Sequence, residues 1–285
     1  MMHVALDQSS GKLVFQKDQS KPGVDGIKLL MAILKEVCPT YLPLKSLCFW
    51  RTMVGDKGLE YICDNLLTKK KNEALAYPGF LNIELFDVKI TPIGCAALAG
   101  KLSMDVSLQS LVLDFNEIGD AGVQILAKGM KKNTELKVLS LGYCKIGPAG
   151  AAAIGDDIIR SSKVTRLRLK GNRIMAAGLN ALSRNIGKSE SLLELDISDN
   201  SITGDPLAIN SLCEALRTSI SIQEVNLEHN VIENDAATTI MDTLIGCPSI
   251  RLFKLCGQEV TSAVYKVAPA PFWGCKVLPA PDLRD

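Results

Sequence analysis

Histidine is nearly absent from this sequence. Only His3 and His229 occur among the 285 residues, so a metal site or an acid/base centre built on imidazole has almost no material. The tripeptide from Gly187 to Ser189 lacks the first glycine of a phosphate loop, and the acidic stretch beginning at Asp196 lacks the glycine and closing glutamate of a calcium loop. We therefore expect no enzyme, no metal, no cofactor and no small-molecule substrate.

Long apolar runs, paired cysteines and a charge excess are also missing. The most apolar stretch near the start, Ile27 to Leu34, is interrupted by Lys28 and is too short to span a bilayer. The nine cysteines are scattered without a C-x-x-C pair, which is typical of reduced core residues in an intracellular protein. With 32 basic and 31 acidic side chains, the formal net charge is only +1. These features predict a soluble cytoplasmic protein with no membrane and no nucleic-acid partner.

What the chain does have is a repeat. The pattern L-x-x-L-x-L-x-x-N-x-I, clearest from Leu108, returns eight times, in steps of 36, 28, 28, 28, 28, 30 and 28 residues. Units of this length cannot bury their own apolar face, so they must stack on neighbours. The first apolar positions of the eight copies are Leu44, Phe80, Leu108, Leu136, Val164, Leu192, Ile222 and Ile250.

Each copy is predicted to fold as strand, turn and helix. In the fourth copy Leu139 and Leu141 alternate with polar or small residues, which indicates a short strand with one buried side. The ninth position is usually asparagine, as at Asn172, and is expected to bond backbone groups that the turn leaves unpaired. Glycines such as Gly122 are then expected to begin a helix. Its apolar face is made of Val123, Ile125, Leu126 and Met130.

These residues resemble the ribonuclease-inhibitor-like class of leucine-rich repeats over residues 44–260. The shared features are the 28-residue period, the Asn or Cys at the ninth position, and the G-x-x-G segment before a helix. The resemblance implies an α/β fold, a right-handed horseshoe solenoid with parallel strands on the concave face and helices on the convex face.

The two ends depart from the pattern. Residues 1–43 are expected to form an N-terminal cap in which a helix from Gly26 to Val37 covers the first of the eight repeats at 44–260. Residues 261–285 form a Pro-rich tail that contains Phe272 and Trp273. That tail is either disordered or an extended segment docked on its own solenoid or on a partner.

Alternate strand positions face away from the core, so they give the expected concave surface. At its N-terminal end Trp50 and Phe86 fall in one row on adjacent strands, where aromatic side chains favour a partner-binding anchor. The N-terminal cap or the tail covering both is the alternative.

The second half of this surface is charged. Basic Arg166 and Arg168 are predicted to lie opposite acidic Glu194 and Asp196, either as simple mutual ion pairs or as a charge border that orients a partner. The further candidate protein-binding residues are Asp114, Lys170, Glu224, Glu228, Phe272 and Trp273.

The predicted function is a non-enzymatic scaffold that binds one or more proteins, within a larger cytoplasmic assembly. Similar repeats of this size occur in axonemal and dynein-regulatory proteins, so the resemblance points first to a cilium or flagellum. Two alternatives share the repeat class: a GTPase-activating protein resembling the Ran-activating proteins, and an inhibitor resembling ribonuclease inhibitor. That inhibitor is cysteine-dense and alternates repeat types, whereas this chain keeps a plain 28-residue step.

Overall fold

The computed structural model divides into two compact units. Unit 1 holds Met1–Lys145 with Ser162–Val164, and unit 2 holds Ile146–Ser161 with Thr165–Asp285. The residues that the structure describes are 3–7, 11–16, 25–30, 32–34, 44–67, 80–104, 107–247 and 249–255.

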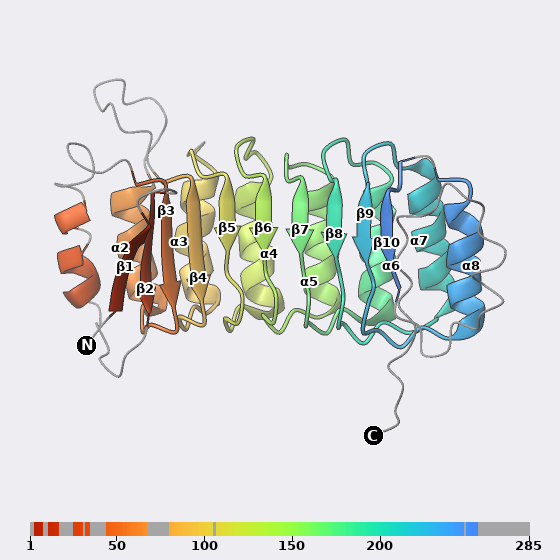
Figure 1. Cartoon of the computed structure of the whole chain (residues 1–285), viewed down its shortest axis with the longest axis horizontal. Helices are drawn as coiled ribbons and strands as arrows, with labels where there is room; N and C mark the ends of the chain where they lie inside the picture. Colours follow the sequence, from red (N-terminus) through yellow and green to blue (C-terminus); the bar gives the residue numbers. More distant parts are fainter. Residues whose placement is uncertain are drawn as a thin grey trace. The chain divides into compact units, whose positions relative to one another are not determined.

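The sheet of unit 1 keeps its strands in chain order. Strands β1 and β2 form an antiparallel hairpin, and β2 to β6 run parallel. Corresponding repeat positions pair across neighbouring strands, as Trp50 does with Phe86. The strands of unit 1 are β1 His3–Asp7, β2 Lys12–Gln16, β3 Ser46–Trp50, β4 Asn82–Phe86, β5 Ser110–Val112 and β6 Val138–Ser140 (Figure 1).

Unit 2 follows the same rule with parallel strands in sequence order. The predicted register is confirmed, because Arg166 pairs with Glu194 and Arg168 with Asp196. The strands of unit 2 are β7 Arg166–Arg168, β8 Glu194–Asp196, β9 Glu224–Asn226 and β10 Leu252–Lys254.

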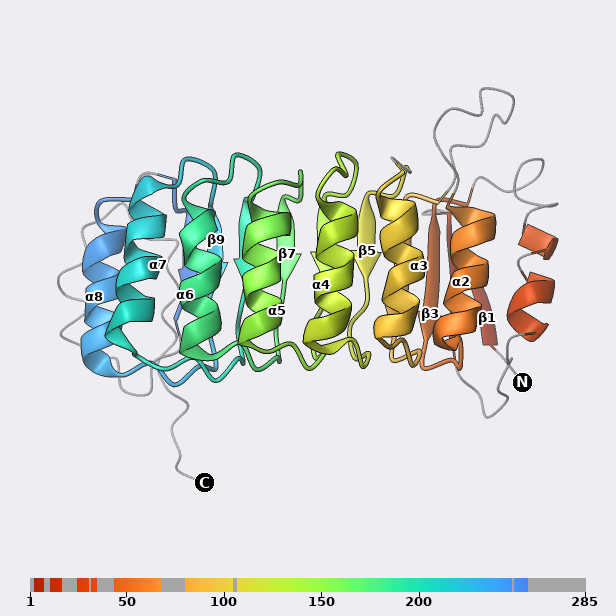
Figure 2. The ribbon, with the colours of Figure 1, turned by 180° about the vertical axis from the view of Figure 1, so that it is seen from behind.

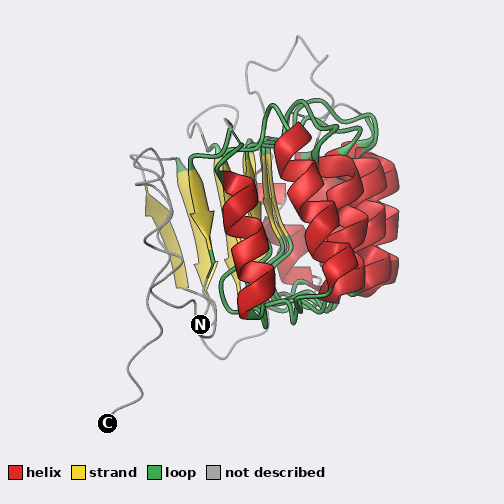
Figure 3. Ribbon diagram, turned by 90° about the vertical axis from the view of Figure 1, so that its right-hand side faces the viewer, coloured by secondary structure: helices red, strands yellow, loops and turns green. Residues whose placement is uncertain are grey.

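In each unit the helices cover one side of the sheet and leave the other side open (Figures 2 and 3). The predicted apolar face of α4 is confirmed at Val123, Leu126 and Met130, which are buried, whereas Ile125 is only partly buried. The helices are α2 Gly55–Leu66, α3 Pro92–Leu102 and α4 Gly119–Met130 in unit 1, then α5 Pro148–Ala153, α6 Met175–Ile186, α7 Pro206–Thr218 and α8 Asn234–Leu244 in unit 2, with the π-helix Ile154–Ile159 continuing α5.

The N-terminal cap contains a β-hairpin in addition to the expected helix. Gly11 turns between its two strands with a φ of 62°, and the alternating Leu13 and Phe15 are buried. The ring of Phe15 stacks on Phe49 of the first repeat with centroids 4.9 Å apart. Residues 25–30 and 32–34 are helical and bury Ile27, so the described part of the predicted covering helix is confirmed.

The asparagine ladder is also confirmed. In unit 1 the Asn116 side-chain oxygen accepts the backbone N–H groups of Val88 and Ile90 at 3.1 and 3.0 Å. Its amide donates to the carbonyls of Leu85 and Leu113 at 2.7 and 2.8 Å. One buried side chain thus satisfies backbone groups of its own turn and of the preceding repeat.

The turns of successive repeats differ although the spacing is regular. In repeats one, three and five the first helical residue, Gly55, Gly119 or Met175, has a φ near 60°. Helices in repeats two, four and six begin instead with a proline, whose ring fixes φ near −65°. In repeats two, four and six the corresponding left-handed residue lies before the helix, in the turn that precedes the proline. These residues are Lys89, Lys145 and Ser201. Two turn geometries alternate along the chain, a difference that the constant 28-residue spacing hides.

The glycines predicted to begin helices lie inside the first helical turn. Helix α4 begins three residues before Gly122, and a Cβ on Gly122 would lie 2.6 Å from Ile118 and 3.1 Å from the Cys95 sulfur. Close packing against the preceding helix, rather than initiation, requires glycine at this position.

Candidate protein-binding surfaces

The predicted aromatic pair of unit 1 is in contact. The rings of Trp50 and Phe86 have centroids 5.8 Å apart at an interplanar angle of 37°, and Trp50 is 49% exposed. Both residues end their strands, β3 and β4. The pair therefore lies at the carboxyl edge of the sheet, where the strands give way to turns.

A second aromatic pair follows on the next two turns and was not among the predicted site residues. Phe115 and Tyr143 stack with centroids 4.6 Å apart and an interplanar angle of only 5°, although they are 53% and 38% exposed. They occupy the eighth position of their repeats, with φ of 63° and 54°. The signal was available in the sequence, since both directly precede the ladder position, but reading alternate strand positions stops one residue short of them.

Backbone bonds connect the turns that carry both pairs. The N–H of Arg51 donates to the carbonyl of Phe86 at 2.8 Å. The N–H of Asp87 donates to the carbonyl of Asp114 at 3.1 Å. The N–H of Phe115 donates to the carbonyl of Gly142 at 2.8 Å. Trp50, Phe86, Phe115 and Tyr143 thus occupy consecutive turns at one edge of unit 1, and we call these four residues the aromatic edge.

Asp114 forms hydrogen bonds that stabilise one turn of the aromatic edge. Its carboxylate accepts the Ser140 hydroxyl at 2.7 Å and the Gly142 N–H at 2.8 Å, which holds the turn that carries Tyr143. The predicted binding residue Asp114 is therefore placed as a positioning group of the aromatic edge.

The N-terminal hairpin extends the sheet of unit 1 beside β3, and one of its side chains reaches across to β4. Lys12 forms an ion pair with Glu84 at 2.7 Å, and Cys48 between them in the sheet is buried. Burial, together with the charge of Glu84, raises the pKa of the Cys48 thiol to about 12. The hairpin leaves Trp50 exposed, so the alternative that the described part of the cap covers the pair is wrong.

In unit 2 the outward side chains of the strands are charged. Arg166 binds Glu194 at 2.7 Å, so one of the two predicted ion pairs is present. Asp196 instead accepts the hydroxyl and N–H of Ser198 at 2.7 and 3.0 Å, and within the described chain Arg168 has no carboxylate within 4.0 Å. Arg168 is exposed. We call the outward side chains of β7 to β10 and the following turns the charged face: Arg166, Arg168, Lys170, Glu194, Asp196, Glu224, Glu228 and Lys254.

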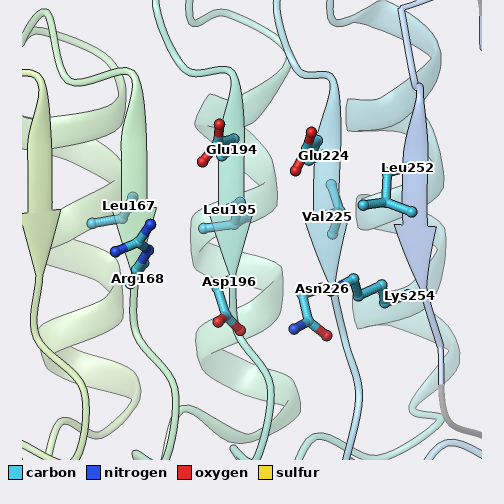
Figure 4. A pocket seen from close by; sticks show the side chains of 10 residues that line it. All are labelled: Leu167, Arg168, Glu194, Leu195, Asp196, Glu224, Val225, Asn226, Leu252 and Lys254. Carbon is cyan, nitrogen blue, oxygen red and sulfur yellow. The ribbon is translucent and has the colours of Figure 1, made fainter.

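A shallow depression of about 190 Å³ lies within the charged face (Figure 4). Its rim includes Glu194 and Glu224, which sit at the same level of adjacent strands, with Arg168 and Lys254 toward opposite sides. The buried side chains of Leu195 and Val225 contribute to its lining.

Two predicted site residues, Phe272 and Trp273, lie outside the described residues. Within the described chain, no group of three or more His, Cys, Asp or Glu residues could hold a metal ion. None of the helices in that same part is long and apolar enough to cross a membrane. Six cysteines there are free and buried.

One family model matches part of the repeat array. The family model described as "Leucine Rich repeat" matches residues 106–127, 132–155 and 188–205. No curated protein matches the chain.

Solved structures with a similar fold share little sequence with it. The actin-binding site 2 of leiomodin-1 is 17% identical with a TM-score of 0.41, over 47% of this chain and 78% of that one. A TLR13–ssRNA13 complex is 15% identical with a TM-score of 0.46, over 87% of this chain and 36% of that one. The family matches, together with the strand, turn and helix of each unit, identify the repeats of this chain as leucine-rich repeats.

Proposed function

We propose that this protein is a non-enzymatic interaction scaffold and that the aromatic edge of unit 1 is its principal partner-binding surface. The observation that carries the proposal is two ring pairs in contact at one sheet edge, in which Trp50, Phe115 and Tyr143 are exposed and Phe86 is half-buried. Aromatic side chains make up only 5% of the chain, yet four of them gather here.

The physical argument is one of burial and rigidity. Each aromatic side chain can bury roughly 150–250 Å² against a partner, and rings already in contact lose little rotamer freedom on binding. The indole N–H of Trp50 adds a donor that can orient a partner. Interfaces draw most of their energy from clusters of this kind.

The proposed setting is a larger cytoplasmic assembly, with the cilium or flagellum axoneme as the first location to test. The free, buried cysteines support a reducing compartment. The axonemal setting rests on the resemblance to repeat proteins of similar size.

An inhibitor resembling ribonuclease inhibitor is the second candidate. Two turn geometries alternate in repeats one to six, and the resemblance implies alternating repeat types in that inhibitor. Binding to a basic ribonuclease tests it. The GTPase-activating alternative is less favoured, because the early ladder positions hold the buried Thr52 and Val88 and not an activating asparagine or arginine. A GTP-hydrolysis assay separates this alternative from the scaffold.

The test of the scaffold is affinity purification from native tissue with matched variants. We expect Trp50→Ala with Phe86→Ala, and separately Phe115→Ala with Tyr143→Ala, to lose the same set of proteins that the wild type recovers. Immunofluorescence of the tagged chain then tests the location.

The control is a pair of exposed apolar residues away from the aromatic edge. Ile93 and Ile220 are 76% and 83% exposed, so Ile93→Ala with Ile220→Ala removes as much exposed apolar surface elsewhere. Equal recovery by the wild type and both aromatic variants, or equal loss in the control, contradicts the proposal.

A further inference from the structure

The charged face of unit 2 holds two like charges side by side. Glu194 and Glu224 pair directly in the register of β8 and β9, and Arg166 forms an ion pair with Glu194 alone. Glu224 is exposed and has no cation within 4.0 Å among the described residues. Like charges directly across neighbouring strands destabilise a sheet, and a cation placed between them removes the repulsion.

The same site offers one apolar side chain to an occupant. Leu252 of β10 pairs in register with Glu224 and is partly exposed, whereas Leu195 and Val225 lie beneath the depression and are buried. A segment that fits this face therefore needs a cationic side chain flanked by apolar ones.

The chain itself supplies such a segment directly after the face. Strand β10 ends at Lys254, and the Pro-rich tail begins at residue 261. Residues 261–281 contain Lys266 and Lys276 but no carboxylate, together with apolar residues that include Phe272 and Trp273.

The reach of this segment is ample. Twelve residues separate Lys254 from Lys266, which allows an extended span of about 40 Å. Four parallel strands are only about 14 Å wide at a spacing of about 4.8 Å. We propose that the Pro-rich tail docks on the charged face of its own chain, placing a lysine against Glu224 and the aromatic residues over the depression.

Trp273 provides the readout. The chain has two tryptophans, so Trp50→Phe leaves Trp273 as the only one in the full-length protein. We expect its emission to be shifted to shorter wavelength and its quenching by acrylamide to be several-fold weaker than in the same chain unfolded in guanidinium chloride.

The role of the Glu224 charge is tested in the Trp50→Phe chain. Glu224→Lys should shift the emission to longer wavelength and restore quenching, whereas Glu190→Lys, an exposed change of the same charge off the face, should alter neither. The circular-dichroism spectrum of each variant shows that the repeats remain folded. Equal quenching of the folded and unfolded chains, or no response to Glu224→Lys, overturns the proposal.

Zero-length carbodiimide cross-linking identifies the occupant. Mixing ¹⁵N-labelled and unlabelled chains at several concentrations, we expect links from Lys266 or Lys276 to carboxylates of the charged face within one chain only. Links between chains, or links that depend on concentration, would assign the face to a second copy and contradict docking in cis.

Discussion

The rings of Phe115 and Tyr143 lie parallel with centroids 4.6 Å apart, although each side chain is more than a third exposed. The two residues occupy the same left-handed turn position in consecutive repeats of unit 1, with φ of 63° and 54°. That left-handed conformation is unfavourable for a phenylalanine or a tyrosine. Both rings are nevertheless exposed there.

The first prediction is that Phe115→Ala reduces partner recovery far more than it reduces stability. Alanine has the same left-handed cost as phenylalanine, so the change isolates the ring, whose stacking is worth about 0.5–1.5 kcal/mol. Denaturant titration measures the stability change. A loss of several kcal/mol would mean that the ring is structural and that its exposure is misleading.

The second prediction separates two neighbouring arginines. Arg166→Glu should destabilise the fold by about 0.2–1 kcal/mol, because its ion pair with Glu194 is partly exposed, and adding Glu194→Arg should restore the loss. The neutral changes compare the two sites without adding a like charge: Arg166→Gln should lose the ion pair, whereas Arg168→Gln should leave stability nearly unchanged, since Asp196 bonds Ser198 instead. Equal losses at both arginines would contradict this assignment.

Much of this fold follows from spacing alone, and the reasons for the remainder are physical. The period located the ladder position of Asn116, because a buried turn must satisfy its backbone groups wherever it recurs. The period could not reveal the alternating turns. A helix that begins with Pro92 and a helix that begins with Gly55 both fit repeats of regular spacing, so the spacing does not distinguish the two turn geometries. It also missed Phe115, whose outward direction depends on a φ sign that an apolar pattern does not encode. The hairpin at Gly11 is too short to produce a period.

The third prediction concerns the ladder of unit 2. Asn172 accepts the N–H of Ile146 at 3.0 Å and donates to the carbonyl of Leu169 at 2.7 Å, and the side chain is buried. Asn172→Ala should lower the free energy of unfolding by roughly 1–3 kcal/mol for each group left unpaired, without loss of the circular-dichroism shape. Asn65→Ala is the control, because its amide makes a single exposed bond to Tyr61. Similar effects of the two changes would show that the ladder does not stabilise the stack.

The last prediction turns on the first repeat, where threonine replaces the ladder asparagine. Thr52 is 3% exposed, and its hydroxyl has no hydrogen-bond partner, the only such buried side-chain oxygen or nitrogen in the described part of the chain. A buried hydroxyl without a partner costs roughly 1–3 kcal/mol, and valine has the same shape without that group. Thr52→Val should therefore raise the denaturation midpoint. Thr243→Val is the matched control, because Thr243 is equally buried but its hydroxyl is satisfied. That hydroxyl donates to the carbonyl of Thr239 at 2.9 Å and accepts from Arg217 at 3.2 Å. Removing the Thr243 hydroxyl should therefore lower the denaturation midpoint. A lower midpoint for Thr52→Val would mean that this hydroxyl is satisfied in solution, and the first turn would then resemble the asparagine turns that follow it.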